Sequence, residues 1–169
     1  MKYYLSLFLI LMNLTSIKAQ EEKNEITTYY LIRHAEKDRT DNSNKDPNLT
    51  DKGKNRAKNW SIVFESIPFD IIYSTNYNRT IQTAEPTANS KNLEIQYYNP
   101  RELYDENFKL KTTGKTVLVV GHSNTTPQFV NKIIGKEKYT DIGDLNNSNL
   151  YIVTIINGVK TAILLKIEY

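Results

Sequence analysis

Two short apolar runs, each leading to a histidine, constrain the fold of this chain more than any other feature. Residues 28–32 (Thr-Tyr-Tyr-Leu-Ile) run directly into Arg33 and His34, and residues 116–120 (Thr-Val-Leu-Val-Val) precede His122 by one residue. Uncharged runs of this length, bounded by polar residues, are typical of buried strands. Such strands deliver side chains to ligands at the carboxyl ends of an open α/β sheet. The chain has only 2 histidines, so their shared placement predicts a functional site.

The rest of the chain alternates predicted helices and strands. Apolar residues at three- and four-residue spacing predict a helix from Asp51 to before Pro68, with Thr50 as its N-cap. The residues that we expect on its sheet-facing side are Ala57, Trp60, Val63 and Phe64. Further helices are expected at residues 77–88 and 126–135, the latter with Thr126 as N-cap, Pro127 as first helical residue and Gly135 as its end.

The remaining segments complete the predicted sheet. Further strands are expected at residues 69–73, 93–97, 150–156 and 159–167, the last two joined by the Asn157-Gly158 turn of a hairpin. Residues 101–111 are predicted as a short helix or irregular segment. This order predicts a three-layer α/β/α sandwich around a mostly parallel, mixed sheet that ends in an antiparallel pair.

The first residues have the layout of a secretory signal peptide. Lys2 gives a positive start, residues 3–14 are uncharged and mostly apolar, and Ile-Lys-Ala at residues 17–19 precedes a polar segment. We therefore expect cleavage after Ala19 and export to the periplasm or the extracellular space. The apolar run is shorter than the roughly 20 residues of a transmembrane helix. A retained interfacial anchor is the alternative.

The chain divides into three predicted parts: a signal peptide at residues 1–19, a flexible N-terminus at residues 20–26 and one domain at residues 27–169.

The composition of the mature chain limits its partners. The formal net charge is +3, and Lys2 and Lys18 leave with the leader, so the mature chain is near neutral. Its cations are dispersed, and we expect no nucleic-acid partner and no stable membrane insertion after cleavage. The chain has 0 cysteines, which excludes disulfides.

Cations and imidazoles converge if the two apolar runs are parallel neighbours. Arg33, His34 and His122 then meet at one sheet edge, and Arg79 joins them from the first turn of the helix at residues 77–88. Two arginines and two imidazoles suit a phosphoryl group, which carries about two negative charges near neutral pH. A neutral imidazole is a nucleophile toward phosphorus, and arginines stabilise the charge on the equatorial oxygens.

Three segments resemble motifs of one known family. They are Leu-Ile-Arg-His-Ala-Glu-Lys at residues 31–37, Ser-Thr-Asn-Tyr-Asn-Arg-Thr-Ile-Gln-Thr-Ala at residues 74–84 and Val-Gly-His-Ser-Asn at residues 120–124. Their order and spacing resemble the histidine phosphatase superfamily, branch 1, which has the phosphoglycerate mutase-like fold. The resemblance covers the chain from Thr27 onward. One departure is Ala35, where glycine is commoner.

The resemblance implies a mechanism and its residues. His34 is then the phosphorylated nucleophile, and Arg33, Arg79 and His122 bind the phosphoryl group, with no metal ion or cofactor required. The implied activity is hydrolysis of small phosphomonoesters or phosphoramidates. A phosphatase is favoured over a mutase because the chain lacks the long insertions with which mutases enclose a second phosphate.

The acid that protonates the leaving group is less well defined. Larger members of the family supply a carboxylic acid, and Glu102 after Arg101 is our candidate, although the expected Gly-x-x-Glu-Gly segment is missing. A solvated surface carboxylate is the alternative for Glu102. Another alignment places Asn99 at the acid position, and Asp105 and Glu36 are weaker candidates. Without an acid, good leaving groups such as phosphohistidine or aryl phosphates would be favoured.

Two other functions stay open at this point. A metal site formed by His34, His122, Glu36 and Asp38 is disfavoured, because neighbouring guanidinium groups repel a cation and no metal-binding spacing is present. A catalytically weak module that binds phosphate or sulfate would use the same pocket. The substrate is not predicted, because it depends on the segments at residues 38–48, 99–111 and 136–147.

Overall fold

The computed structural model describes residues 25–168 of the chain. The predicted signal peptide and most of the predicted flexible N-terminus lie outside these residues. The described elements are, in chain order, β1 (Ile26–Arg33), α2 (Asp51–Val63), β2 (Ile71–Ser74), α3 (Asn78–Lys91), β3 (Ile95–Tyr97), α4 (Glu106–Thr112), β4 (Thr116–Gly121), α5 (Thr125–Ile134), β5 (Asn149–Ile156) and β6 (Val159–Lys166).

A mixed sheet of 6 strands in the order β3-β2-β4-β1-β5-β6 forms the centre of the protein. β4 lies between β1 and β2 and is parallel to both, and β2 is also parallel to β3. β5 is antiparallel to β1 and β6. The predicted parallel pairing of the two strands that precede the histidines is confirmed. Arg33 lies opposite Gly121 in the register of this pair.

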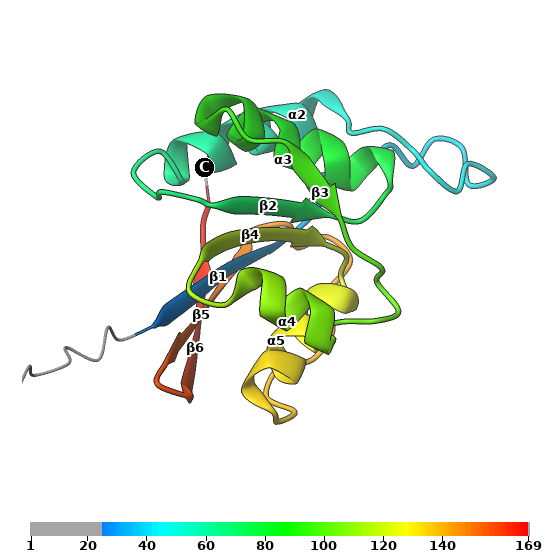
Figure 1. The fold of residues 1–169 in the computed structure, drawn as a ribbon. Coiled ribbons are helices and arrows are strands. Elements are labelled where there is room, and N and C mark those ends of the chain that lie inside the picture. The colour runs from blue at the N-terminus through cyan, green and yellow to red at the C-terminus, as the bar shows by residue number, and fades with distance from the viewer. Residues whose placement is uncertain (1–24, 169) are drawn as a thin grey trace, which may run out of the picture.

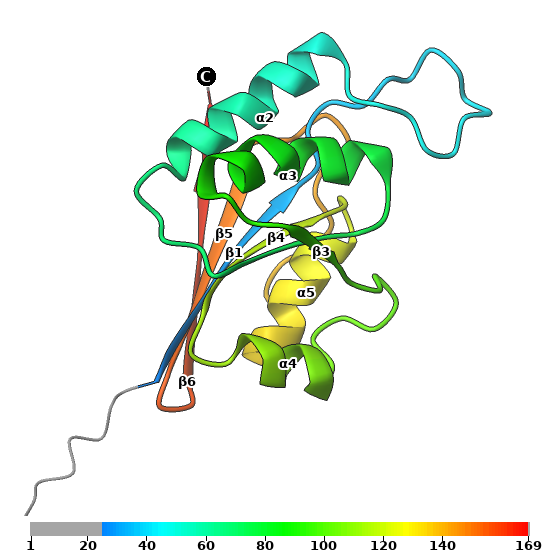
Figure 2. The ribbon, with the colours of Figure 1, turned by 45° about the horizontal axis from the view of Figure 1, so that its top comes forward.

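Two layers of helices cover the sheet. α2 and α3 lie over one face, and α4 and α5 lie over the other (Figure 1). Trp60 of α2 stacks on Phe64, the C-cap residue of that helix, at a ring separation of 5.5 Å in the first core. Phe108 of α4 and Phe129 of α5 meet edge to face at 5.0 Å in the second core. The predicted three-layer α/β/α sandwich is therefore confirmed. Figure 2 shows the same layers from above.

Some predicted helix details are correct and others are wrong. Thr50 caps α2 by accepting a hydrogen bond from the Gly53 amide at 3.1 Å, as predicted. Val63 is 37% exposed, because it lies about 100° around the helix from Phe64 and so turns away from the sheet. The N-cap of α5 is Asn124 and not Thr126. The helix starts earlier because the Thr125 hydroxyl accepts from the His122 amide at 3.0 Å and tightens the preceding turn.

The C-terminal hairpin forms as predicted. Asn157 and Gly158 connect β5 to β6 with φ values of 50° and 80°. Both values lie in the left-handed region that a two-residue type I′ turn requires, which explains the Asn-Gly sequence. Among the helices of residues 25–168, none combines the length and the apolar character needed to cross a bilayer.

The start of α2 is pressed against the segment that follows β1. The Thr50 amide donates to the Glu36 carbonyl at 2.9 Å, and a Cβ on Gly53 would lie 2.2 Å from the same oxygen. Only glycine allows this approach without moving the backbone. The contact fixes the backbone immediately after His34, where the functional residues are expected.

Candidate functional site

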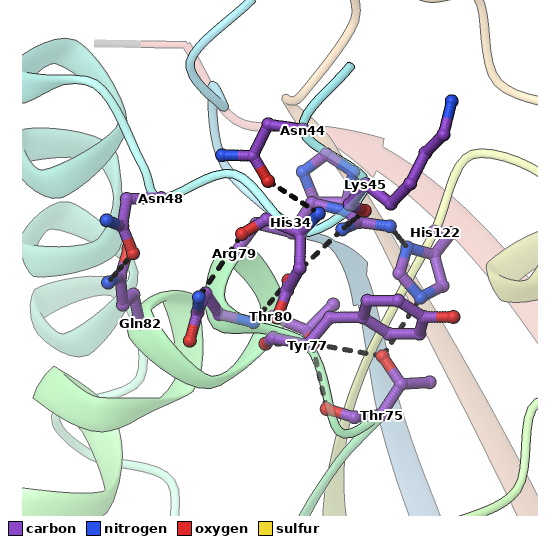
Figure 3. A network of polar contacts seen from close by, with 12 residues as sticks. His34, Asn44, Lys45, Asn48, Thr75, Tyr77, Arg79, Thr80, Gln82 and His122 are labelled. Atoms are coloured by element: carbon purple, nitrogen blue, oxygen red, sulfur yellow. Dashed lines mark hydrogen bonds and ion pairs between the residues drawn. The ribbon is translucent and has the colours of Figure 1, made fainter. Parts of the chain in front are cut away.

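The structure brings His34, His122 and Arg79 together at the carboxyl edge of the sheet. The His34 amide donates to the Gly121 carbonyl at 2.9 Å, which extends the pairing of β1 and β4 by one residue. The two imidazole rings lie 5.6 Å apart, centroid to centroid. Arg79, in the first turn of α3, donates from Nη2 to Nδ1 of His122 at 3.4 Å (Figure 3).

Residues distant in the sequence fix His34 in one orientation. Its backbone carbonyl accepts a hydrogen bond from Asn147 at 2.8 Å, and the amide of the next residue, Ala35, donates to the Thr83 hydroxyl at 2.9 Å. Nδ1 of the ring lies 2.7 Å from the Ala35 carbonyl. A carbonyl only accepts hydrogen bonds, so Nδ1 carries the proton and Nε2 keeps its lone pair.

Burial keeps the imidazole of His34 neutral. The side chain is 4% exposed. Burial, with the charges of Arg33 and Arg79 adding to it, lowers the pKa of His34 to about 3. Near neutral pH, His34 therefore offers an uncharged nitrogen with a free electron pair.

His122 is also neutral and is held between two partners. Nδ1 faces the Arg79 guanidinium, which only donates, so Nε2 carries the proton and donates to the Thr75 hydroxyl at 2.9 Å. Thr75 in turn lies 3.0 Å from the hydroxyl of Thr80, and the Tyr77 ring packs edge-on against the imidazole at 5.2 Å (Figure 3). Burial, followed by the charges of Arg79 and Arg33, lowers the pKa of His122 to about 4.

Arg33 is anchored by one end of its guanidinium. Nη1 donates to the carbonyls of Gly143, Asp144 and Asn146, each at 2.9 Å, and Nη2 contacts the Asp144 carboxylate at 3.2 Å. The side chain is 3% exposed. Nε is buried, yet within the described residues it has no hydrogen-bond partner.

Arg79 shows the same pattern. Nη1 lies 3.5 Å from the Asp46 carboxylate, Nη2 contacts His122, and the buried Nε has no partner among the described residues. Asp46 also accepts from the Asn78 amide at 2.8 Å and so caps α3 from the loop at residues 38–48, in place of Tyr77, whose side chain makes no capping bond. Two buried N–H donors without acceptors, beside two neutral imidazoles, favour an anion.

The carboxylates expected as acids are placed differently from the prediction. Glu102 and Asp105 line a separate cavity of about 190 Å³, which contains neither histidine. The Asp105 carboxylate accepts from the Phe108 amide at 2.7 Å and caps α4. Asn99 lies in the same cavity and accepts from the Arg101 amide at 3.1 Å. The structure therefore does not bring Glu102 to the histidines.

Glu36, another candidate acid, is bound by Arg56. Arg56 donates to both of its carboxylate oxygens, from Nε at 2.9 Å and from Nη2 at 2.8 Å. Burial raises the pKa of Glu36, but the hydrogen bonds from Arg56 outweigh this and hold it below its usual value. The group is therefore ionised and acts as a structural link between the His34 segment and α2.

The alternative metal site does not form. Within residues 25–168, no group of three or more histidine, aspartate or glutamate side chains is arranged to hold a metal ion. Of the proposed ligands, Glu36 is bound to Arg56, and Asp38 accepts from the Thr40 amide and hydroxyl at 2.9 and 2.8 Å.

Several residues of the site were not predicted from the sequence. Thr83 follows Arg79 by four residues on the same helical face, so helical spacing could have suggested it. Asp144 and Asn147 lie more than a hundred positions from the residues that they contact, in a loop without a motif. No local signal in the sequence identifies them.

Comparison with known structures identifies the fold. A phosphoglycerate mutase from Bacillus anthracis superposes with a TM-score of 0.65 at 18% identity, covering 84% of this chain and 93% of that one. YhfR from Bacillus stearothermophilus gives 0.65 at 17%, covering 84% and 98%. The protein histidine phosphatase SixA complexed with tungstate gives 0.63 at 15%, covering 82% and 96%. The protein has the phosphoglycerate mutase-like α/β fold.

A family model matches part of the sequence. The model of the histidine phosphatase superfamily (branch 1) matches residues 29–100, which include Arg33, His34 and Arg79. The match confirms the resemblance for the first two of the three motifs and supports a phosphatase-type or mutase-type function, while the motif at residues 120–124 lies outside the matched residues. A search of curated proteins finds no match.

We predict that both histidines stay neutral far below the pH at which an exposed imidazole titrates. With pKa values of about 3 for His34 and about 4 for His122, both rings should show the neutral pattern in long-range ¹H–¹⁵N NMR spectra down to about pH 5. The chain has 2 histidines, so the variants His34→Gln and His122→Gln assign the signals. A ring that titrates near the ordinary value of about 6.5 in the folded, anion-free protein would contradict this site.

Proposed function

We propose that this protein is a phosphatase that hydrolyses small phosphomonoesters or phosphoramidates through a phosphohistidine on His34. The observation that carries the proposal is the pair of unpartnered, buried Nε–H groups of Arg33 and Arg79 beside the imidazole of His34. Buried donors of this kind favour a multiply charged anion. The neutral imidazole then supplies the nucleophile that such an anion can react with.

The first step forms the phosphoenzyme. The phosphoryl group binds to the Nε atoms of Arg33 and Arg79, and Nε2 of His34 attacks phosphorus in line with the leaving group. The hydrogen bond from Nδ1 to the Ala35 carbonyl orients the ring and stabilises the positive charge that develops on it. The arginines stabilise the charge on the equatorial oxygens, a role that metal ions have in other phosphoryl-transfer sites.

The second step returns the enzyme to its starting state. Water attacks the phosphorus of the phosphohistidine, the bond to Nε2 breaks, and inorganic phosphate leaves. His122 gains a proton when the bound dianion offsets the two arginine charges, because an opposite charge raises the pKa of an imidazole. The new proton is on Nδ1, which no longer accepts from Arg79 and donates to a phosphoryl oxygen in both steps, while the bond from Nε2 to Thr75 fixes the orientation of the ring.

We predict that turnover of p-nitrophenyl phosphate in the presence of EDTA depends on His34. His34→Ala should reduce activity to background, because it removes the nucleophile. Arg79→Ala should lower kcat/KM by about 10²-fold or more, the usual effect of losing one donor to a transition-state oxyanion. Arg101→Ala, at an exposed position in the loop before α4, is the matched control and should have little effect.

Other outcomes separate this proposal from its alternative. Equal losses in Arg79→Ala and Arg101→Ala would show that the wrong arginine has been assigned. No turnover of any monoester by the wild type, together with thermal stabilisation by phosphate, would show a phosphate- or sulfate-binding module. Turnover that requires an added divalent cation would contradict the metal-independent mechanism.

We also propose that the protein is exported, on the basis of the leader at residues 1–19. A positively charged start, an apolar core and Ala19 before a polar segment support this proposal. Expression of the full chain in a bacterial host should give a mature protein that begins at Gln20 and is released with the periplasmic or extracellular fraction. Intact-mass measurement checks the cleavage, and a chain that keeps Met1 or residues 2–19 would contradict it.

A further inference from the structure

A cavity of about 250 Å³ opens directly beside His34. Its charged lining consists of Glu36, Lys37, Arg39, Lys52 and Asp144. In an in-line attack the phosphoryl group lies in front of His34 and the leaving group lies beyond it, so both need open space at this edge of the sheet, and this cavity is lined by the nucleophile itself. The group that protonates the leaving oxygen is therefore sought in its lining.

Neither carboxylate of this cavity can release a proton near neutral pH. Glu36 is held ionised by its bidentate hydrogen bonds from Arg56. Asp144 accepts from Arg39 at 2.9 Å and from Arg33 at 3.2 Å, and these hydrogen bonds lower its pKa further below the ordinary aspartate value. Both groups are already acceptors for arginines, so both lack the proton that a general acid needs.

Lys37 is placed differently from the other cations of the lining. Its backbone pairs with Leu49 in an isolated antiparallel bridge, and the next amide, of Asp38, donates to Asn48 at 2.8 Å, so the base of the loop at residues 38–48 is fixed. The side chain is half-buried. None of the ion pairs in the described part of the chain includes Lys37.

The surroundings of Lys37 make its ammonium a stronger acid. Burial comes first, and the charges of Arg79, Arg39 and Arg33 add to it, while Asp144 acts in the opposite sense; together they lower the pKa of Lys37. Glu36 and Lys52 also line this space and are paired with each other at 3.6 Å. The charge of Lys37 in turn acts on the imidazole of His122, which places it within electrostatic range of the reacting groups.

We propose that the ammonium of Lys37 is the general acid that protonates the leaving group, in place of a carboxylic acid. This inference rests on the proposed function. In the first step, the bond between phosphorus and the leaving oxygen breaks as Nε2 of His34 bonds to phosphorus. The electron pair goes to the leaving oxygen, which takes a proton from Nζ of Lys37, and the lysine becomes neutral.

The second step restores the proton. The neutral Nζ accepts a proton from the water that attacks the phosphohistidine, the bond from phosphorus to Nε2 breaks with its electron pair returning to nitrogen, and phosphate is released. Lys37 then carries its charge again, and no other reactant is consumed. This mechanism extends the substrates from good leaving groups to ordinary alkyl phosphates.

The test compares leaving groups of decreasing quality. In Lys37→Gln, kcat/KM should fall by about 10²-fold or more for glycerol 2-phosphate, the size of a typical general-acid contribution, and by less than about tenfold for p-nitrophenyl phosphate. Phenyl phosphate should lie between them. Lys58→Gln, at an exposed position of α2, is the matched control and should leave all three values unchanged.

A second variant separates proton donation from charge. Lys37→Arg keeps the positive charge, but a guanidinium does not release a proton in this range, so it should be as slow as Lys37→Gln on glycerol 2-phosphate. Recovery in Lys37→Arg would overturn the proposal and show that the charge alone matters. A wild-type enzyme whose kcat/KM declines across the series as steeply as that of Lys37→Gln would also overturn it. Failure of the wild type on p-nitrophenyl phosphate would instead refute the proposed function.

Discussion

The parallel pairing of β1 with β4 is the interaction on which the whole site depends. It places Arg33 opposite Gly121, and the bond from the His34 amide to the Gly121 carbonyl continues the ladder into the site. A shift of one residue in this register would turn every side chain of β1 to the opposite face. The buried apolar residues of both strands oppose such a shift, so the same core that stabilises the sheet also fixes the distance between the two histidines.

This arrangement is electrostatically unfavourable without a ligand. Two nearly buried arginines lie beside two imidazoles, and among residues 25–168 only Asp144 and Asp46 form ion pairs with those arginines. The protein responds by keeping both imidazoles neutral and by binding the outer ends of the guanidinium groups with loop carbonyls. The inner Nε–H groups have no hydrogen-bond partner in the part of the chain that the structure describes. A bound anion would offset the charge and satisfy these donors together, so in the proposed function the same geometry accounts for both phosphate binding and reactivity toward phosphorus.

The sequence predicts the sheet and the convergence of the four residues because these depend on local patterns. Buried runs mark the strands, and a strand end or a first helical turn fixes where Arg33, His34, Arg79 and His122 lie. The acid was not predictable in this way. In the sequence, Glu36 and Asp105 have no obvious partner. In the structure, Glu36 pairs with Arg56 and Asp105 caps α4, and the pairing with Arg56 has no local pattern that would predict it. The same holds for Asp144, whose loop binds Arg33 from a distant part of the chain.

Small errors in the helices have a similar origin. Val63 fits an apolar spacing, but its neighbour Phe64 takes the position against the sheet, and a residue one step along a helix points elsewhere. Thr126 is a good N-cap in isolation, but the hydroxyl of Thr125 binds the amide of His122 and starts α5 earlier. In both cases tertiary contacts decide between choices that are nearly equal in local preference.

The central claim is that residues 33, 34, 79 and 122 surround a single tetrahedral anion. A crystal structure of the protein with bound tungstate tests it most directly. One oxyanion should bind within hydrogen-bond distance of Nε of Arg33 and Nε of Arg79. Its central atom should face Nε2 of His34, and one of its oxygens should contact the His122 ring. An anion bound elsewhere, or one that leaves either Nε without an acceptor, would contradict the account.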